Sequence, residues 1–244
     1  MSIPPEGSPA VTRPRPAPAG DGTRRWAGGR LAALGAVVAC LLVLTLLWIG
    51  VWTHFGAQLR LDTSLSRVFY VGDHRSAALN DLLQVITAPG LSVVRYVVAL
   101  PVVVLLVRAR AWWTLAWVAT VVVLIGPLNT AVKTVVGRIR PPFVDGGAMD
   151  PSKSFPSGHS SGIAASVVVA LVAAWPLLSA RARWVWVPVG VVVIVLVGFS
   201  RMWLGEHYLS DVLGGWSLGI ACALLTALLF DAFPGGRAAL PARR

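Results

Sequence analysis

Charged residues are scarce in this sequence. They make up 13% of the 244 residues, about half of the share in a soluble globular domain. Hydrophobic residues make up 56%, and the mean hydropathy is +0.74. So few ionic groups could not cover the surface of a water-soluble fold with this much apolar material. The composition excludes a disordered or collagen-like chain and favours a protein that lies in a lipid bilayer.

Cysteine is also rare. The chain has two cysteines, Cys40 and Cys222, and both lie inside apolar runs, where a thiol usually behaves as a small buried hydrophobe. A disulfide scaffold is therefore excluded. Acidic residues number 10 against 21 basic ones, which gives a formal charge of +11. Such an excess suits nucleic acid, anionic lipid or the loop asymmetry of a membrane protein, so the positions of the charges must decide.

The first thirty residues predict a disordered, basic, proline-rich tail. Six prolines and five arginines lie there, with almost no large apolar side chain. The apolar run Leu31–Trp52 follows. Arg24 and Arg25 before that run resemble an export signal, but the run is too long for a signal peptide and no small-residue cleavage site follows it. We therefore expect an uncleaved first transmembrane helix. The tail lacks interleaved aromatics, so no nucleic-acid partner is expected.

Six apolar stretches are near the length that crosses a bilayer. They are Leu31–Trp52, Leu91–Val107, Trp112–Val132, Gly162–Ser179, Trp184–Phe199 and Tyr208–Phe230. We predict an all-α, polytopic membrane protein with six transmembrane helices, a membrane domain over 31–232 and a cytoplasmic C-terminal tail over 233–244. The segment Ser64–Thr87 is amphipathic and is placed at the outer interface, with its boundary to the second span left open.

Basic residues set the expected orientation. Twelve arginines fall on one face of the six-span topology and eight basic residues fall on the other, with Arg95 inside the second span. The face with twelve should be cytoplasmic. Both termini are then cytoplasmic in the plasma membrane, and the loops 133–160 and 200–207 lie on the outer face. Arg95 is expected to snorkel to the outer surface, with contact to a lipid headgroup as the alternative.

Polar groups converge on that outer face. Lys133 and Arg140 are seven residues apart, so a helix that continues past Val132 would place both cations on one side before Pro141 ends it. Ser157 and Gly158 lie just ahead of the fourth span, where free backbone N–H groups and the positive helix end favour an anion. This combination predicts a phosphate site.

Two histidines and an aspartate add a nucleophile and an acid. His207 and Asp211 are four residues apart at the start of the sixth span, so the carboxylate can hold the imidazole in one tautomer and leave the far nitrogen free to attack. His159, from a different span, could donate a proton to a departing oxygen. Together they provide what a two-step phosphoryl transfer requires.

These residues form three motifs that resemble a known family. The motifs are Lys133-x6-Arg140-Pro141, Pro156-Ser157-Gly158-His159 and Ser200-Arg201-x5-His207-x3-Asp211. In order and spacing they resemble the signature motifs of the type 2 phosphatidic acid phosphatase superfamily, which includes bacterial lipid phosphatases, glucose-6-phosphatases and vanadium haloperoxidases. The likeness covers roughly residues 80–230.

The resemblance implies a role for each matching residue. His207 would form a phosphohistidine, Asp211 would orient it, and His159 would protonate the leaving oxygen and later activate water. The phosphoryl oxygens would be held by Lys133, Arg140, Ser157, Gly158 and Arg201. Preorganised cations and N–H donors suit a transition state with charge spread over three oxygens, and this arrangement requires no metal and no cofactor.

The expected activity is therefore hydrolysis of a phosphomonoester or diphosphate on a lipid, such as undecaprenyl diphosphate, phosphatidylglycerol phosphate or phosphatidate. Alternatives are a lipid flippase or transporter that only binds the charged group, a vanadate-dependent haloperoxidase, and a metal site that includes Glu206 beside the histidines. Arg138 and Lys153 are interpreted as snorkelling loop cations without a catalytic role. The oligomeric state is not predicted.

Overall fold

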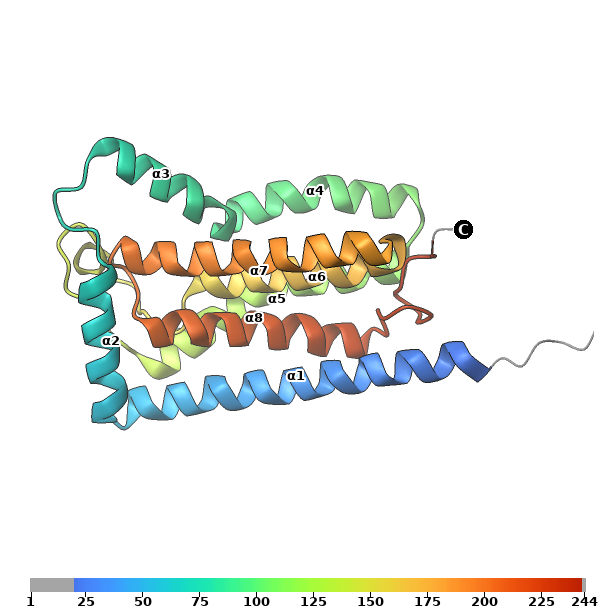
Figure 1. Cartoon of the computed structure of the whole chain (residues 1–244), viewed down its shortest axis with the longest axis horizontal. Helices are drawn as coiled ribbons and strands as arrows, with labels where there is room; N and C mark the ends of the chain where they lie inside the picture. Colours follow the sequence, from blue (N-terminus) through green and yellow to red (C-terminus); the bar gives the residue numbers. More distant parts are fainter. Residues whose placement is uncertain (1–19, 243–244) are drawn as a thin grey trace, which may run out of the picture.

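Eight α-helices carry the described part of the chain, residues 20–242 of a computed structural model (Figure 1). Residues 20–242 contain no β-strand. Short 3-10 turns lie at Ala88–Gly90, Gly147–Met149 and Trp175–Leu177. The helices are α1 (Gly20–Trp52), α2 (Gly56–Phe69), α3 (Ala77–Thr87), α4 (Ser92–Arg108), α5 (Trp112–Val136), α6 (Gly158–Ala174), α7 (Ala180–Trp203) and α8 (Leu209–Leu229).

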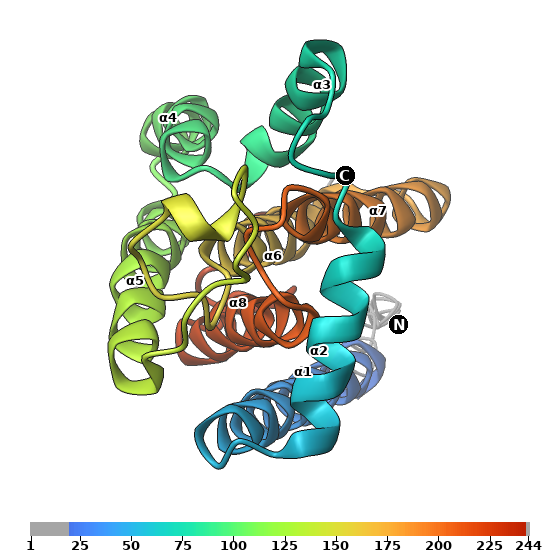
Figure 2. The ribbon, with the colours of Figure 1, turned by 90° about the vertical axis from the view of Figure 1, so that its left-hand side faces the viewer.

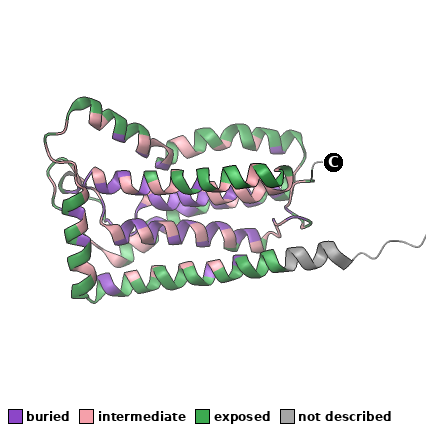
Figure 3. Ribbon diagram, viewed as in Figure 1, coloured by how far each residue is buried: buried purple, intermediate pink, exposed green. Residues whose placement is uncertain are grey.

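Five of these helices are long and apolar enough to cross a membrane: α1, α5, α6, α7 and α8. A sixth crossing is formed if α3 and α4 count as one span, which is bent by 52° at the break between Gly90 and Ser92. Many residues of α1, α4 and α7 are exposed (Figure 3), and large apolar ones are among them, as expected for surfaces that face lipid rather than water. The chain is an all-helical, multi-pass membrane protein, as the sequence predicted.

The segment 64–87 differs from its prediction. It contains the end of α2, a loop and α3, rather than one interfacial stretch. Helix α2 lies across one end of the bundle (Figures 1 and 2), in keeping with an interfacial position. Helix α3 instead packs on α7 and leads into α4. Leu83 and Thr87 are buried against the bundle, and α3 with α4 is long and apolar enough to form one bent span, which is the extension of the second span that the sequence analysis left open.

Both ends of the described chain also differ from the predicted boundaries. Helix α1 begins at Gly20, eleven residues before Leu31, because the last proline of the tail is Pro18 and nothing after it stops a helix. The predicted disorder of residues 1–19 falls outside the described residues. At the other end, residues 233–242 fold back on the bundle, where the Ala238 carbonyl accepts a hydrogen bond from Thr114 Oγ1 at 3.0 Å.

Helices α6 and α8 form the centre of the bundle, and glycines allow their close approach (Figure 2). A Cβ atom at Gly215 would lie 2.6 Å from the Ser157 carbonyl oxygen, and one at Gly219 would lie 2.2 Å from the Ser161 carbonyl oxygen. Small residues four apart are the usual way for helices to pack closely in a membrane. This contact fixes the first turn of α6 against the start of α8.

Candidate active site

Two loops and the first turn of α6 meet at the end of the bundle that α2 crosses (Figure 2). The loop 137–157 begins at Gly137, which has φ +66° and caps α5 by donating its N–H to the Lys133 carbonyl at 2.9 Å. A left-handed glycine is a common helix terminator. The predicted helix from Lys133 to Arg140 was therefore wrong, and a loop brings Arg140 to the site instead.

His207 is the buried centre of this region, with 1% of its surface exposed. Its Nδ1 faces Asp211 Oδ2 at 3.4 Å, and its Nε2 faces Arg140 Nη1 at 3.4 Å. The prediction placed His207 and Asp211 in one helix, but α8 begins at Leu209. The contact arises because Asp211 turns back to cap the helix, accepting the Tyr208 N–H at 2.9 Å.

Burial keeps the His207 imidazole neutral. It lowers the pKa of His207 from 6.5 to about 4, although Asp211 acts in the opposite direction and raises it. The neighbouring Arg140 and Arg201 guanidinium groups lower this pKa further. With its Nδ1 proton directed to the carboxylate, the neutral ring keeps a lone pair on Nε2, on the side of the two arginines.

Arg138 is held in the site by two carboxylates, which the sequence analysis missed. Its Nη1 donates to Asp211 Oδ1 and Ser210 Oγ, both at 2.6 Å, and its Nη2 donates to Asp62 Oδ2 at 2.7 Å. The Arg138 side chain is 8% exposed, so it does not snorkel. Asp62, on α2, also accepts the Ser210 N–H at 3.0 Å. The interpretation of Arg138 as a surface cation was wrong.

Two further arginines form a cationic pair beside His207. Arg140 and Arg201 are both buried, and both contact the carboxylate of Glu206. Arg201 also donates to Thr87 Oγ1 at 3.0 Å, and Arg140 Nη2 lies 2.7 Å from Asp150 Oδ2. A single carboxylate thus bridges the two cations, where an anion of similar size and charge could replace it.

The remaining predicted anion-binding residues are Lys133, Ser157 and Gly158. Lys133, in the last turn of α5, is within electrostatic range of Arg140, Arg201 and Asp211. Ser157 is fully buried, caps α6 through its side chain and donates its N–H to the Asp211 carbonyl at 2.9 Å. Gly158 is the first residue of α6, as expected for an anion site at a helix N-terminus.

Asn129 is a second residue that the sequence analysis missed. Its Nδ2 donates to Ser161 Oγ at 3.1 Å and to the Pro156 carbonyl at 3.4 Å, which ties α5 to the loop before α6. It is buried and lies one turn before Lys133. A polar amide inside an apolar span was a usable signal, because such groups are retained in membranes where they have a partner.

His159 follows Gly158 and lines a cavity of about 440 Å³. Its Nε2 is buried and has no hydrogen-bond partner among the described residues. Arg140, Arg201 and His207 are within electrostatic range of it. Lys153, by contrast, lies in the exposed part of the loop. The structure therefore joins His207, Asp211, Arg140, Arg201 and Ser157 through direct or shared contacts, with Lys133 and His159 within electrostatic range and Gly158 between Ser157 and His159 in the chain. It adds Arg138, Asp62, Glu206 and Asn129.

The donor set does not form a metal centre. Within the part of the chain that the structure describes, no three His, Cys, Asp or Glu side chains are grouped so that they could hold a metal ion. Glu206 is directed to the arginines rather than to the histidines. A neutral, oriented imidazole beside three cations is instead an arrangement for nucleophilic attack on an anion whose charge the cations neutralise.

Comparisons with known proteins agree with this geometry. Phosphatidylglycerophosphatase B of Bacillus subtilis is 33% identical to this chain. The alignment covers 68% of this chain and 82% of that protein. A lipid A 1-phosphatase of Rhizobium etli is 34% identical, with the match covering 48% of this chain and 51% of that protein. An undecaprenyl-diphosphatase of Sulfolobus acidocaldarius is 32% identical over 33% of this chain and 35% of its own length.

A solved structure is also similar. It is the crystal structure of a transmembrane PAP2-type phosphatidylglycerolphosphate phosphatase from Bacillus subtilis, with a TM-score of 0.65 and 29% identity, and the match covers 82% of this chain and 98% of that one. The family model of the PAP2 superfamily matches residues 110–234, which include the three motifs. The chain therefore belongs to the PAP2 superfamily.

Proposed function

We propose that this chain is an integral membrane lipid phosphatase that hydrolyses a phosphomonoester or diphosphate on a lipid, through a phosphohistidine. Candidate substrates are phosphatidylglycerol phosphate, undecaprenyl diphosphate and phosphatidate. The observation that carries the proposal is the buried, neutral His207, with Asp211 on one ring nitrogen and Arg140 beside the other. The relatives named above, which are phosphatases of membrane lipids, support it.

In the first step, His207 Nε2 attacks the terminal phosphorus. The N–P bond forms while the bond between phosphorus and the leaving oxygen breaks, and His159 gives that oxygen a proton. The Nε2 of His159, which has no hydrogen-bond partner among the described residues, supports this role, as does the cavity that the His159 side chain lines. Asp211 holds the Nδ1 proton of His207 and stabilises the positive charge that the ring acquires.

In the second step, water attacks the phosphohistidine. His159, now deprotonated, accepts a proton from the water, the N–P bond breaks and inorganic phosphate is released. His207 returns to its neutral form, which its burial favours. The step therefore restores the starting protonation of both histidines without an external base.

The phosphoryl oxygens would be held by cations and by the start of α6. Arg140 and Arg201 would exchange the Glu206 carboxylate for phosphate oxygens, and Lys133 would add a third positive charge. Ser157 and Gly158 would contribute the N-terminus of α6. Preorganised donors of this kind stabilise the charge that develops in the transition state. The mechanism uses no metal and no cofactor.

We also propose the orientation that the charge bias favours. The site would lie at the outer face of the plasma membrane, and both termini would be cytoplasmic. Helix α1 begins at the same end of the bundle at which the described part of the chain ends, opposite α2 and the site (Figure 1). A substrate at headgroup depth would then reach the site from within the outer leaflet.

Phosphate release by purified protein in detergent tests this function. Phosphatidylglycerol phosphate, undecaprenyl diphosphate and phosphatidate are compared with excess chelator present, and His207→Gln is the control. We expect chelator-resistant turnover of at least one lipid and its loss in the variant. Release that chelator abolishes, or release that His207→Gln retains, would contradict the mechanism. A protein that moves lipid but releases no phosphate would favour a transporter.

A further inference from the structure

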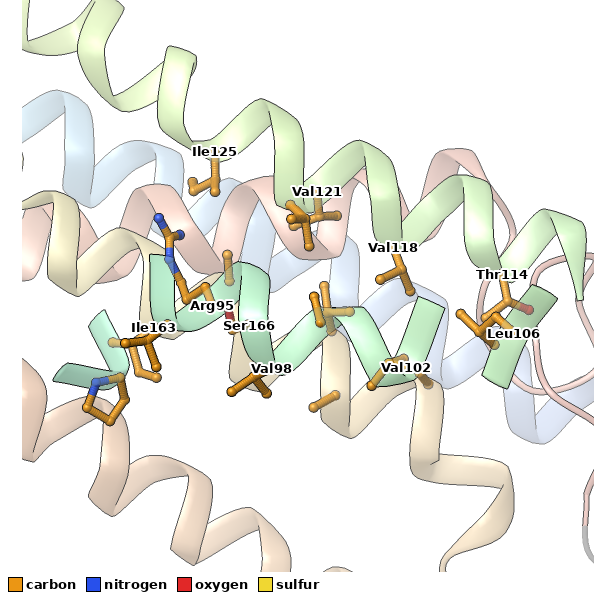
Figure 4. A pocket seen from close by; sticks show the side chains of 18 of the residues that line it. Arg95, Val98, Val102, Leu106, Thr114, Val118, Val121, Ile125, Ile163 and Ser166 are labelled. Carbon is orange, nitrogen blue, oxygen red and sulfur yellow. The ribbon is translucent and has the colours of Figure 1, made fainter. Parts of the chain in front are cut away.

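A second cavity lies between α4, α5 and α6, away from the catalytic loops (Figure 4). It has a volume of about 240 Å³ and an almost entirely apolar lining. Figure 4 shows Arg95 at one end of it and Leu106 and Thr114 at the other. From Arg95 to Leu106 the cavity follows α4 for about 16 Å at 1.5 Å per residue. This is about half of a 30 Å hydrocarbon core, the depth of one leaflet.

The apolar cavity adjoins the cavity that His159 lines, which has a larger polar share. Arg95 and Ile125 line both of them. Moving along α4 and then the 3-10 turn Ala88–Gly90, a ligand would pass from hydrocarbon-like surroundings, past the Arg95 guanidinium, to His159. Arg95 therefore lies where the two cavities meet. If a lipid bound there, Arg95 would face the segment between its hydrocarbon chain and its reacting phosphoryl group.

The Arg95 side chain has one hydrogen-bond partner in the described part of the chain. Its Nη2 donates to Ser92 Oγ at 2.7 Å, while its buried Nε has no partner in the described part of the chain. The guanidinium lies over Gly162, one turn beyond His159, where an added Cβ would be 2.2 Å from Nη1. A cation inside a span is costly, and the first turn of a helix disfavours positive charge.

We propose that Arg95 binds a second phosphate of the lipid substrate, one that lies between the scissile phosphoryl group and the hydrocarbon chain. The inference rests on the proposed function and narrows its substrate class. Two lipid chemistries have a phosphate at that place: a prenyl diphosphate and a phosphatidylglycerol phosphate. Phosphatidate does not, because its one phosphate is the group that would be cleaved and its glycerol esters would face Arg95.

Steady-state kinetics with Arg95→Gln and Arg95→Lys test the inference. The wild-type protein and the variants are compared in mixed micelles on undecaprenyl diphosphate, phosphatidylglycerol phosphate and phosphatidate. Arg108→Gln, at the far end of α4, is the matched control. For Arg95→Gln we expect kcat/KM on a two-phosphate lipid, relative to phosphatidate, to fall about 10- to 100-fold, the usual effect of a lost charged hydrogen bond. Arg108→Gln should leave that ratio unchanged.

The two sources of the second phosphate give different results. A fall confined to undecaprenyl diphosphate identifies a prenyl diphosphate, and a fall confined to phosphatidylglycerol phosphate identifies the phosphoglycerol lipid. A wild-type protein that prefers phosphatidate, or an Arg95→Gln variant that slows all three lipids equally, overturns the inference while the proposed function stands.

Binding of product lipids separates the inference from catalysis. Phosphatidylglycerol and undecaprenyl phosphate retain the second phosphate after the terminal one is lost. Phosphatidylglycerol carries it as a diester with no terminal phosphoryl group, and undecaprenyl phosphate, a monoester, is assayed with phosphate release monitored, so that binding at Arg95 is measured without turnover. We expect both, or the one that matches the substrate, to raise the Tm of the wild-type protein more than that of Arg95→Gln. Diacylglycerol should not discriminate between them. Equal shifts in both proteins would overturn the inference even if phosphate release were confirmed.

Discussion

Replacing Arg138 by Gln should damage the protein more than any other single change of charge outside the catalytic residues. Arg138 is the cation shared by two buried carboxylates, with 2.6 Å from its Nη1 to Asp211 Oδ1 and 2.7 Å from its Nη2 to Asp62 Oδ2. The Asp62 side chain is 3% exposed and that of Asp211 is not exposed. Without the guanidinium, both carboxylates would be buried without a charge partner.

The magnitude follows from that geometry. Breaking a buried ion pair by removing one partner costs about 3–5 kcal/mol, because the remaining charge is uncompensated. Asp62→Asn should cost less, about 1–3 kcal/mol, since the pair of Arg138 with Asp211 survives and the amide oxygen can still accept the Ser210 N–H. In the double variant Arg138→Gln/Asp62→Asn, the loss of unfolding free energy should be smaller than the sum of the two single losses. The reason is that the second substitution removes one of the two buried carboxylates that Arg138→Gln leaves without a charge partner.

Activity should follow the same order. In the proposed mechanism Asp211 orients His207, and loss of an orienting carboxylate lowers turnover by up to about 10⁴-fold in serine proteases. We expect a decrease in kcat of about 10²- to 10⁴-fold for Arg138→Gln and a smaller decrease for Asp62→Asn. Arg138→Lys should not restore kcat, because one ammonium group cannot reproduce the planar fork that reaches Asp62, Asp211 and Ser210 together.

The assay combines unfolding and turnover. Unfolding in detergent micelles, followed by tryptophan fluorescence, gives the free energy of unfolding of each variant, and phosphate release gives kcat. Arg67→Gln, an exposed position on α2, is the control and should stay within about 0.5 kcal/mol of the wild-type protein. An Arg138→Gln variant with wild-type stability and kcat, or an Asp62→Asn variant more damaged than Arg138→Gln, would refute the reasoning.

Three more predictions concern His207, Glu206 and Gly219. The pKa of His207 is about 4 in the folded protein and 6.5 when unfolded, so its contribution to stability is present above pH 6.5 and is lost as the pH falls toward 4. Between pH 7 and pH 5, the free energy of unfolding of the wild-type protein should fall by about 2 kcal/mol more than that of His207→Gln, as measured by chemical unfolding. Glu206→Gln should bind orthovanadate about 10-fold more tightly in inhibition assays, since Arg140 and Arg201 lose their competing carboxylate. Gly219→Ala should lower both the Tm and kcat, because the new Cβ meets the Ser161 carbonyl at 2.2 Å and separates α6 from α8.

Each of these has an outcome that contradicts it. Parallel pH profiles of unfolding for the wild-type protein and His207→Gln would mean that the imidazole is not desolvated. Unchanged or weaker vanadate inhibition in Glu206→Gln would mean that its carboxylate does not occupy the anion site. For the glycine, Gly28→Ala is the control, because a Cβ there meets nothing within 4 Å; equal Tm values for the two alanine variants would show that α6 and α8 tolerate separation.

The spans and the motif residues could be predicted because each depends on local chemistry. Long apolar runs mark the helices, and the three motifs fix the residues that meet at one end of the bundle. The residue at which α5 ends after Lys133 could not be predicted in the same way. Whether α5 continues to Arg140 or ends at Gly137 depends on one glycine at φ +66°, and that choice decides which of Arg138 and Arg140 faces which partner.

The positioning residues were missed because they depend on contacts between distant segments. Asp62 pairs with Arg138, 76 residues later in the chain, and that pair forms only because α2 crosses the end of the bundle. Nothing in the amphipathic pattern of α2 distinguishes a buried aspartate from a solvated one. Glu206 presents the same difficulty, since its role depends on two arginines that come from a loop and from α7.

Trapping the phosphoenzyme tests the central claim most directly. Wild-type protein is mixed with a preferred lipid, quenched within milliseconds at alkaline pH, where phosphohistidine is stable, and digested for mass spectrometry. The account predicts a phosphoryl group on His207 and its absence in His207→Gln; in His159→Gln, both its formation and its hydrolysis should be slower. Turnover of the lipid by the wild-type protein with no phosphorylated His207, or with the phosphoryl group on another residue, would contradict it.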